Sequence, residues 1–201
     1  MIQAAEIEGL LKGALDREVW VVTAAAGARR GALTATWVSP VSVDPDRPML
    51  LAGLAPNHFT AGLVRECGSF VAHLLRPEQA ELAFRMASCS GRQGDKLAGL
   101  DVQTGSTGSP VLRDCAAWFE CRVMGMYNAG DRLFFWADIV AAERMAEGPV
   151  LREQAFFGQL TGEQKQRLRQ DLQSDLAIQR PLHQQWREMA SRGTSIASVN
   201  Q

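Results

Sequence analysis

The sequence predicts a mainly β (β+α) protein, built as an antiparallel β-barrel with peripheral helices and a C-terminal helical extension. About six short segments are rich in β-branched and apolar residues, which is typical of strands. Several of them follow one another too closely for the helical crossover that parallel strands need. From Thr161 onward the chain becomes polar and gains helical periodicity. A doubly wound parallel sheet is therefore excluded.

Length and charge set the class of protein. The chain has 201 residues, which favours one domain with an appendage. We expect a barrel domain over residues 1–160 and an extension over 161–201. Lys and Arg number 21 against 22 Asp and Glu, a net charge of −1, so a basic nucleic-acid-binding surface is excluded and nothing attracts anionic membranes.

Three further features predict a cytoplasmic protein without a metal. No apolar run approaches the length of about 18 residues that a membrane-spanning helix needs. Glu6 and Glu8 stand where a signal peptide would carry Lys or Arg. The four cysteines form no C-x-x-C pair and the three histidines are isolated, so metal-ligand spacing is absent. We expect four reduced thiols, with Cys89 the most exposed.

The first third of the chain alternates between strands and turns. Apolar residues at helical spacing predict an amphipathic helix over residues 3–15. The β-branched and aromatic segment 19–23 predicts a strand, and the glycines that bound 27–31 predict a turn. Residues 31–43 again read as one strand, and the prolines and aspartates of 44–48 predict the turn that ends it.

The middle of the chain contains strands, helices and a loop. The apolar run 49–54 predicts a buried strand, and Asn57 is a good N-cap for the helix that follows. Residues 69–75 predict a strand. Pro77 is suited to the first turn of a helix that we expect to run to about Ala87. The glycines and serines of 88–110 predict a long loop.

The sequence also predicts the elements of the last part of the barrel and of the extension. Residues 117–126 and 133–142 predict two strands joined by a hairpin-like turn. Thr161 and Gln164 fit a capping box at the start of a helix. We expect Pro181 to interrupt that helix, with a second apolar stripe after it, and residues 191–201 to be frayed.

No familiar catalytic signature is present. The chain lacks a G-x-S-x-G elbow, a phosphate loop of the Walker type and an H-E-x-x-H helix, and 27–31 lacks the spacing of a dinucleotide fingerprint. No catalytic residue is assigned and no metal is expected. Small, polar and basic residues instead gather in three places, which are Thr34, Ala35, Thr36 and Trp37 on a strand, Asn57, His58 and Thr60 at a helix start, and Arg92 and Lys96 on a glycine-rich loop.

Each of these groups has a functional and a structural interpretation. Helix starts and basic loops favour anions such as phosphate. The threonines are also ordinary strand residues, and Asn57 is also an ordinary cap. Arg92 and Lys96 are also ordinary solvated charges, and Trp37 is also an ordinary core residue.

The chain resembles the flavin reductase-like, FMN-binding split-barrel family. Its segment 34–45, T-A-T-W-V-S-P-V-S-V-D-P, is similar to the T-A-S-S-F-x-S-V-S-L-D-P segment of that family. Similar motifs follow in the family's order, and the resemblance covers about residues 15–160. The matching segments after the first are 57–60, 70–75, 79–84, 95–99, 109–112, 118–123 and 130–132.

The resemblance implies an antiparallel split β-barrel that forms a homodimer with a flavin at each subunit interface. In such proteins the strand equivalent to 34–37 borders the isoalloxazine ring, and the helix start and basic loop hold the phosphate. FMN is the implied cofactor, with FAD as the alternative and NAD(P)H as co-substrate. Hydride would pass from NAD(P)H to flavin and on to a small-molecule acceptor or a partner monooxygenase. Neither nucleic acid nor membrane is expected as a partner.

Three departures from the family pattern keep other interpretations open. Arg132 replaces the family's G-D-H histidine, His73 replaces an asparagine in its strand motif, and Asn57 or His58 replaces a serine. We expect His73 to be a hydrogen-bonded strand residue and Arg132 to be a charge of the turn. The alternative functions are a flavin carrier or sensor without NAD(P)H turnover, and a split barrel that has lost flavin and serves as a dimeric interaction protein.

Overall fold

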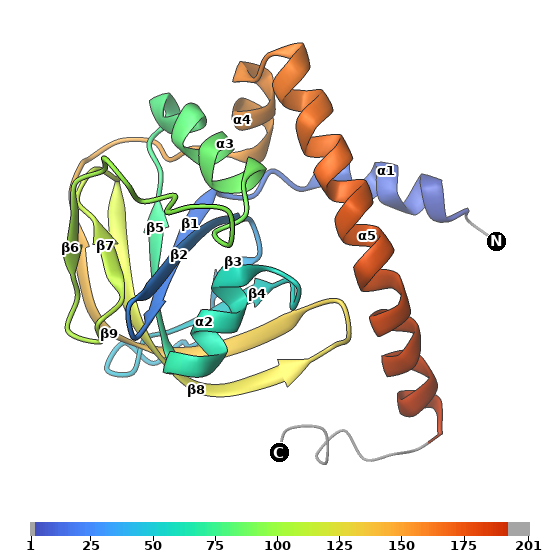
Figure 1. Cartoon of the computed structure of the whole chain (residues 1–201), viewed down its shortest axis with the longest axis horizontal. Coiled ribbons are helices and arrows are strands. Elements are labelled where there is room, and N and C mark those ends of the chain that lie inside the picture. Colours follow the sequence, from blue (N-terminus) through green and yellow to red (C-terminus); the bar gives the residue numbers. More distant parts are fainter. Residues whose placement is uncertain (1–2, 193–201) are drawn as a thin grey trace.

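A computed structural model describes residues 3–192. Seven strands form one curled antiparallel sheet in the order β2-β1-β5-β8-β9-β4-β3, and β6 and β7 form a separate hairpin. Figure 1 shows the sheet curling into a half-barrel with the helices around it. The predicted fold class is thereby confirmed. The strands are β1 Trp20–Ala26, β2 Arg29–Ala35, β3 Val38–Pro40, β4 Met49–Leu54, β5 Ser69–Leu74, β6 Val102–Thr104, β7 Pro110–Leu112, β8 Ala117–Asn128 and β9 Leu133–Arg144.

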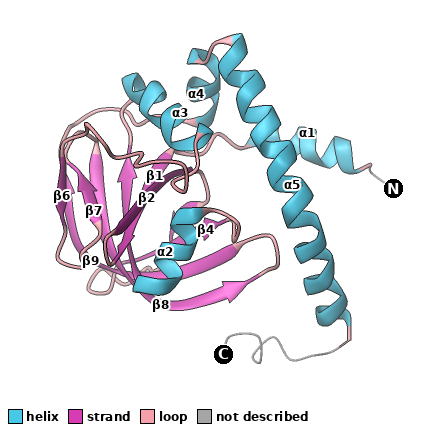
Figure 2. Ribbon diagram, in the orientation of Figure 1, coloured by secondary structure: helices cyan, strands magenta, loops and turns pink. Residues whose placement is uncertain are grey.

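Helices close the two sides of the curled sheet (Figure 2). The interior is filled by Phe70 and Phe135, and α2 places Leu63 and Val64 against them. The outer face near β1 is covered by α3, α4 and the first turns of α5, with Leu168 packed on that cluster. The helices are α1 Ala4–Ala14, α2 Phe59–Cys67, α3 Ala80–Ser88, α4 Glu153–Gln159 and α5 Gly162–Ser191, with a 3₁₀ turn over Pro77–Gln79.

The expected single strand over 31–43 is wrong, because the chain breaks at a bend over Thr36 and Trp37. The strand before the bend, β2, lies at one edge of the sheet, and β3 lies at the other. Trp37 already belongs to the second edge, since its carbonyl accepts the Gly53 amide at 2.7 Å. One strand cannot pair at both edges, so the bend is required where the barrel closes.

The predicted loop 88–110 is also wrong in part, because it contains β6 and leads into β7. Strands of three residues are too short to show a period of two. The β6–β7 hairpin is bound to β5, since the Leu112 amide donates to Nε2 of His73 at 3.0 Å. The short helix α4 was likewise not predicted.

The helix α5 runs unbroken through Pro181, so the expected interruption is wrong. Before the proline, Gln179 is buried against the barrel. After it, the helix packs on the β8–β9 turn so closely that a Cβ on Gly130 would lie 2.6 Å from the Leu182 carbonyl oxygen. Contacts on both sides offset the cost of a proline inside a helix. The predicted capping box of Thr161 and Gln164 is confirmed. Of the expected fraying over 191–201, Ser191 still belongs to α5, and residues 193–201 lie outside the described residues.

The four cysteines are free thiols. Cys89 is exposed, as predicted, while Cys115 and Cys121 are buried. Burial raises the pKa of Cys115 to about 11, so this thiol stays protonated and unreactive at neutral pH. None of the described helices is long and apolar enough to cross a membrane.

Candidate functional site

A cavity of about 450 Å³ lies between β2, the start of α2, the loop after α3 and the middle of α5. Its volume is within the range of small-molecule and cofactor sites, about 300–1,000 Å³. Six of the nine residues predicted to bind a cofactor line it, and they come from three separate segments of the sequence. They are Thr34, Asn57, His58, Thr60, Arg92 and Lys96.

The start of α2 opens into this cavity. His58, not Asn57, is the N-cap residue, and no side chain caps the helix. The expectation that Asn57 caps the helix is therefore wrong by one residue. The unpaired amides at this end and the helix dipole favour an anion. Thr60 lies in the first turn and is 2% exposed.

The two predicted basic residues stand on the opposite wall. Arg92 donates from Nη1 to the Asn57 carbonyl oxygen at 3.0 Å, and its guanidinium lies 5.9 Å from the centre of the Phe59 ring. Arg92 is therefore oriented toward the start of α2 and is not a freely moving loop charge.

Lys96 is the buried cation of the cavity. It is 8% exposed, and its Nζ donates to the Met86 carbonyl oxygen at 2.6 Å. An ammonium has three N–H groups, and no carboxylate among the described residues pairs with this one. Burial lowers its pKa to about 8, because an uncompensated charge is costly there. Such a cation favours an anionic ligand in the cavity.

The other basic pair near this side of the barrel is already neutralised. Arg29 binds Glu66, and Arg30 binds Asp95 at 2.6 Å. Neither arginine lines the cavity. An anion site at Arg29 and Arg30 is thus not favoured.

Of the segment 34–37, Thr34 lies at the cavity and Trp37 lies on the exposed surface outside it. Thr34 lines the cavity, but its hydroxyl donates to the Ala83 carbonyl oxygen at 2.6 Å. Ala35 is buried in the core, and Thr36 is half-buried in the bend. Trp37 is 41% exposed and stacks on Phe134 with ring centres 6.1 Å apart. The expectation that all four residues lie on a strand holds for the first two.

Arg132 connects these two places. Its guanidinium lies 5.0 Å from the centre of the Trp37 ring, and Nη1 donates to Oε1 of Gln179 at 2.7 Å. Gln179 donates in turn to Oδ1 of Asn57 at 3.0 Å. Arg132 is therefore more than a charge of the turn, since it joins the exposed tryptophan to the cavity through α5.

His73 is far from any such role. It is fully buried, with Nδ1 2.9 Å from the Val21 carbonyl oxygen and Nε2 accepting from Leu112. Burial lowers its pKa to about 4. It is the hydrogen-bonded strand histidine that the sequence indicated.

The sequence predicted the helix α5 but none of the side chains through which it forms a wall of the cavity. Asp175 accepts from Nδ2 of Asn57 and contacts Nε2 of His58, both at 2.7 Å. Asp171 is bound by Arg167 at 3.1 Å, and both line the cavity. Periodicity predicted the helix but carried no signal of where it docks.

The arrangement can bind an anionic group and orient the molecule attached to it. Within residues 3–192, no cluster of His, Cys, Asp or Glu could hold a metal ion. The donors instead comprise the α2 amides, the Thr60 hydroxyl, Arg92 and Lys96. Their chemistry matches a phosphate, which accepts several charge-assisted hydrogen bonds at once.

Comparison with known proteins identifies the family. The sequence matches the flavin reductase like domain over residues 13–157. The chain belongs to the flavin reductase-like family. The match ends before α5, so the family's shared domain does not account for this wall of the cavity.

Relatives and solved structures agree with that family. A probable flavin reductase of Rhizobium meliloti is 34% identical over 133 residues, which cover 65% of this chain and 41% of the relative. An FMN reductase (NADH), SmoA, of Agrobacterium fabrum is 28% identical, and the match covers 74% of this chain and 82% of the relative. The structure of BorF, the flavin reductase component of a bacterial two-component tryptophan halogenase, is 28% identical, with a TM-score of 0.65 over 77% of this chain and 95% of that chain.

Several curated relatives are longer than this chain. The matched regions span 26% of diflavin flavoprotein A 1 of Synechocystis and 41% of the Rhizobium protein. The flavin reductase-like domain thus also occurs as one part of longer proteins.

Proposed function

We propose that this chain is a flavin reductase-like oxidoreductase that binds FMN and transfers hydride from NADH or NADPH to flavin and on to an acceptor. The observation that carries the proposal is the cavity lined by Arg92, Lys96 and the start of α2, which belong to the matched flavin reductase-like domain. The name of the Agrobacterium relative supports FMN and NADH in particular. FAD remains the alternative flavin.

The residues of the cavity fit the phosphate end of FMN. That phosphate carries about 1.5–2 negative charges at neutral pH. Arg92, Lys96, Thr60 and the α2 amides would bind it, and His58 would add a donor. Lys96 fits best, because a bound dianion would compensate a charge that is now buried with one carbonyl partner.

Bound flavin supplies the hydride-accepting chemistry, so the protein needs no acid or base of its own. The chain would position the ring and control its environment. Residues 34–37 border the cavity at Thr34 and reach the exposed Trp37, so this segment would lie along the ring. Hydrogen-bond donors near the ring would stabilise the negative charge of the reduced form.

A flavin carrier or sensor without NAD(P)H turnover is the second candidate. The observation in its favour is that Arg132, which replaces the family's histidine, is already held by Gln179 and by Trp37. An arginine with these partners is not free to bind a nicotinamide nucleotide.

The absorption spectrum of the purified protein, before and after NADH or NADPH, tests these functions. We expect flavin bands that bleach on addition of one nicotinamide under anaerobic conditions. A protein with flavin bands that neither nucleotide bleaches would be the carrier. A protein that binds no flavin would overturn both functions and leave the dimeric interaction protein.

We further propose a homodimer. Four large apolar side chains on β8, β9 and the bend before β3 are exposed, and a second subunit would cover them. They are Trp37, Met124, Trp136 and Val140. Trp118 is 8% exposed and belongs to the core, so it is not available to such an interface. Sedimentation is expected to give a dimer at micromolar concentration, and a monomer with flavin bound would contradict this.

The acceptor is proposed as free flavin or a partner monooxygenase. The halogenase reductase component shows that a similar domain occurs in two-component systems. The balance of charge and the free thiols favour a cytoplasmic protein without nucleic-acid or membrane partners.

A further inference from the structure

The helix α5 places a carboxylate on the polar groups that precede α2. One oxygen of Asp175 accepts from Asn57 and the other contacts His58, both at 2.7 Å. A second residue of α5, Gln179, donates to Oδ1 of Asn57 at 3.0 Å. A carboxylate near a helix start is stabilised by the same dipole and donors that stabilise a phosphate.

The charges of α5 are not all equivalent. Asp171 is bound by Arg167 through both carboxylate oxygens, at 3.2 and 3.1 Å, so its charge is compensated. Among the ion pairs of the described residues, Asp175 has His58 as its partner and no arginine or lysine. Asp175 thus places a negative charge in a cavity whose other groups favour a bound anion.

The position of Asp175 is fixed by its neighbours. Gln179, one turn further along α5, is 3% exposed and is held between Asn57 and Arg132. Further along, the helix packs on Gly130. Figure 1 shows α5 running past the side of the barrel on which α2 lies. Before Asp175, Leu168 packs on the core cluster that includes α3. The carboxylate is therefore held at the start of α2 by contacts on both sides of it along the helix.

We propose that Asp175 is a specificity-determining residue that competes with the phosphate of a flavin for Asn57 and His58. A phosphate that binds Asn57 and His58 at the start of α2 must displace this carboxylate, because like charges in such a site repel. A flavin without a phosphate meets no such penalty. The inference rests on the proposed flavin function, and it concerns a helix outside the matched family domain.

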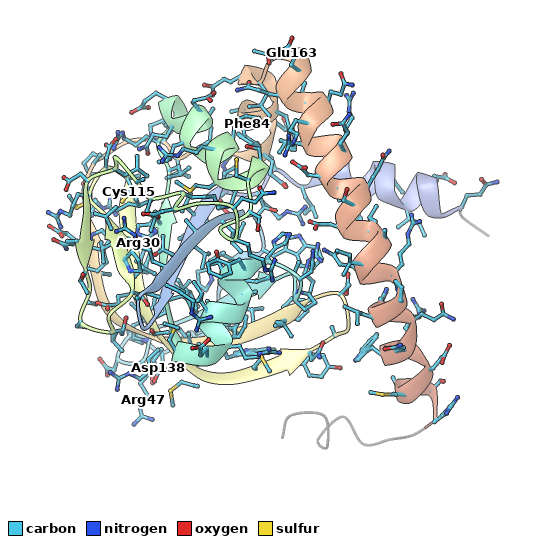
Figure 3. The ribbon with its side chains drawn as sticks, in the orientation of Figure 1. Arg30, Arg47, Phe84, Cys115, Asp138 and Glu163 are labelled. Atoms are coloured by element: carbon cyan, nitrogen blue, oxygen red, sulfur yellow. The ribbon has the colours of Figure 1, made fainter. Side chains whose placement is uncertain are left out.

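The test compares FMN with riboflavin in the full chain. In Asp175→Asn, the amide keeps the shape and retains a hydrogen-bond acceptor for Asn57, but the charge is removed. We expect FMN to bind at least about tenfold more tightly than to the parent, because one repulsive charge contact is gone, and riboflavin to bind equally. The matched control is Glu163→Gln, which removes the same charge from the exposed start of α5, far from α2 in Figure 3. It is expected to leave both affinities unchanged.

A second measurement needs no variant. Amide exchange along 171–179 of the parent is expected to become faster when FMN saturates the site, because the phosphate releases Asp175, and to stay unchanged with riboflavin. Unchanged or weaker FMN binding by Asp175→Asn would overturn the inference, as would slower exchange with FMN. If the parent and the variant both bind no flavin, the proposed function fails and the inference fails with it. The parent's own flavin titration separates that result from the others.

Discussion

Replacing the buried His73 with leucine is expected to lower the free energy of unfolding at pH 7 by about 2–5 kcal/mol. The imidazole satisfies two buried backbone groups, the Val21 carbonyl and the Leu112 amide. Leucine fills similar space but can pair with neither, and each buried group left without a partner costs about 1–3 kcal/mol. Urea unfolding of parent and variant at pH 7 measures the loss.

The same histidine makes the parent sensitive to acid. Its pKa lies at about 4 in the folded state, against an ordinary value of 6.5, because burial disfavours the charged ring. Between these values the unfolded chain binds a proton that the folded chain does not, so the stability present above pH 6.5 is lost as the pH falls toward 4. A shift of this size corresponds to roughly 3 kcal/mol.

The difference in stability between the parent and His73→Leu should therefore shrink by roughly 3 kcal/mol between pH 7 and pH 4, because leucine does not titrate. Other groups titrate in both proteins and cancel in the comparison. His183→Asn on α5 serves as a control that keeps the buried ring, and it should preserve the parent's acid sensitivity. A constant difference across this pH range would show that the ring does not remain neutral in the folded state.

The sequence predicted the sheet well because its long strands carry strong patterns. Strands such as β8 and β9 extend over 12 residues each, and their partners in the barrel bury one face, so alternation is visible. The strands of three residues, β3, β6 and β7, have no such signal. The bend at Trp37 was missed for a different reason, since it depends on which edge of the sheet each half of the segment joins.

The candidate site was predictable only where its residues follow a local rule. A helix start and a glycine-rich loop with cations indicate an anion site in the sequence, and the structure brings both segments to one cavity. The docking of α5 follows no local rule. It depends on hydrogen bonds between residues such as Asn57 and Asp175, which are 118 positions apart, and helical periodicity does not encode a partner at that distance.

The substitution Arg92→Ala is expected to weaken FMN binding by about 1.5–3 kcal/mol, which corresponds to about ten- to a hundredfold in Kd. The guanidinium is oriented toward the start of α2 by its bond to the Asn57 carbonyl and by the Phe59 ring. It is thus positioned to give a charge-assisted hydrogen bond to the phosphate. Titration of the apoprotein with FMN, followed by flavin fluorescence, measures the change.

Riboflavin decides whether the arginine acts on the phosphate. Because riboflavin lacks that group, its weaker binding should hardly change in Arg92→Ala, whereas a misfolded variant would lose both ligands alike. Arg29→Ala is the matched control, since Arg29 carries the same charge on the same side of the barrel but is paired with Glu66 outside the cavity. It should leave FMN binding unchanged. No loss of either ligand would mean that Arg92 is a loop charge, and that Lys96 and the α2 amides bind the phosphate without it. Equal losses of FMN and riboflavin would also contradict the prediction, because the arginine would then act on the fold and not on the phosphate.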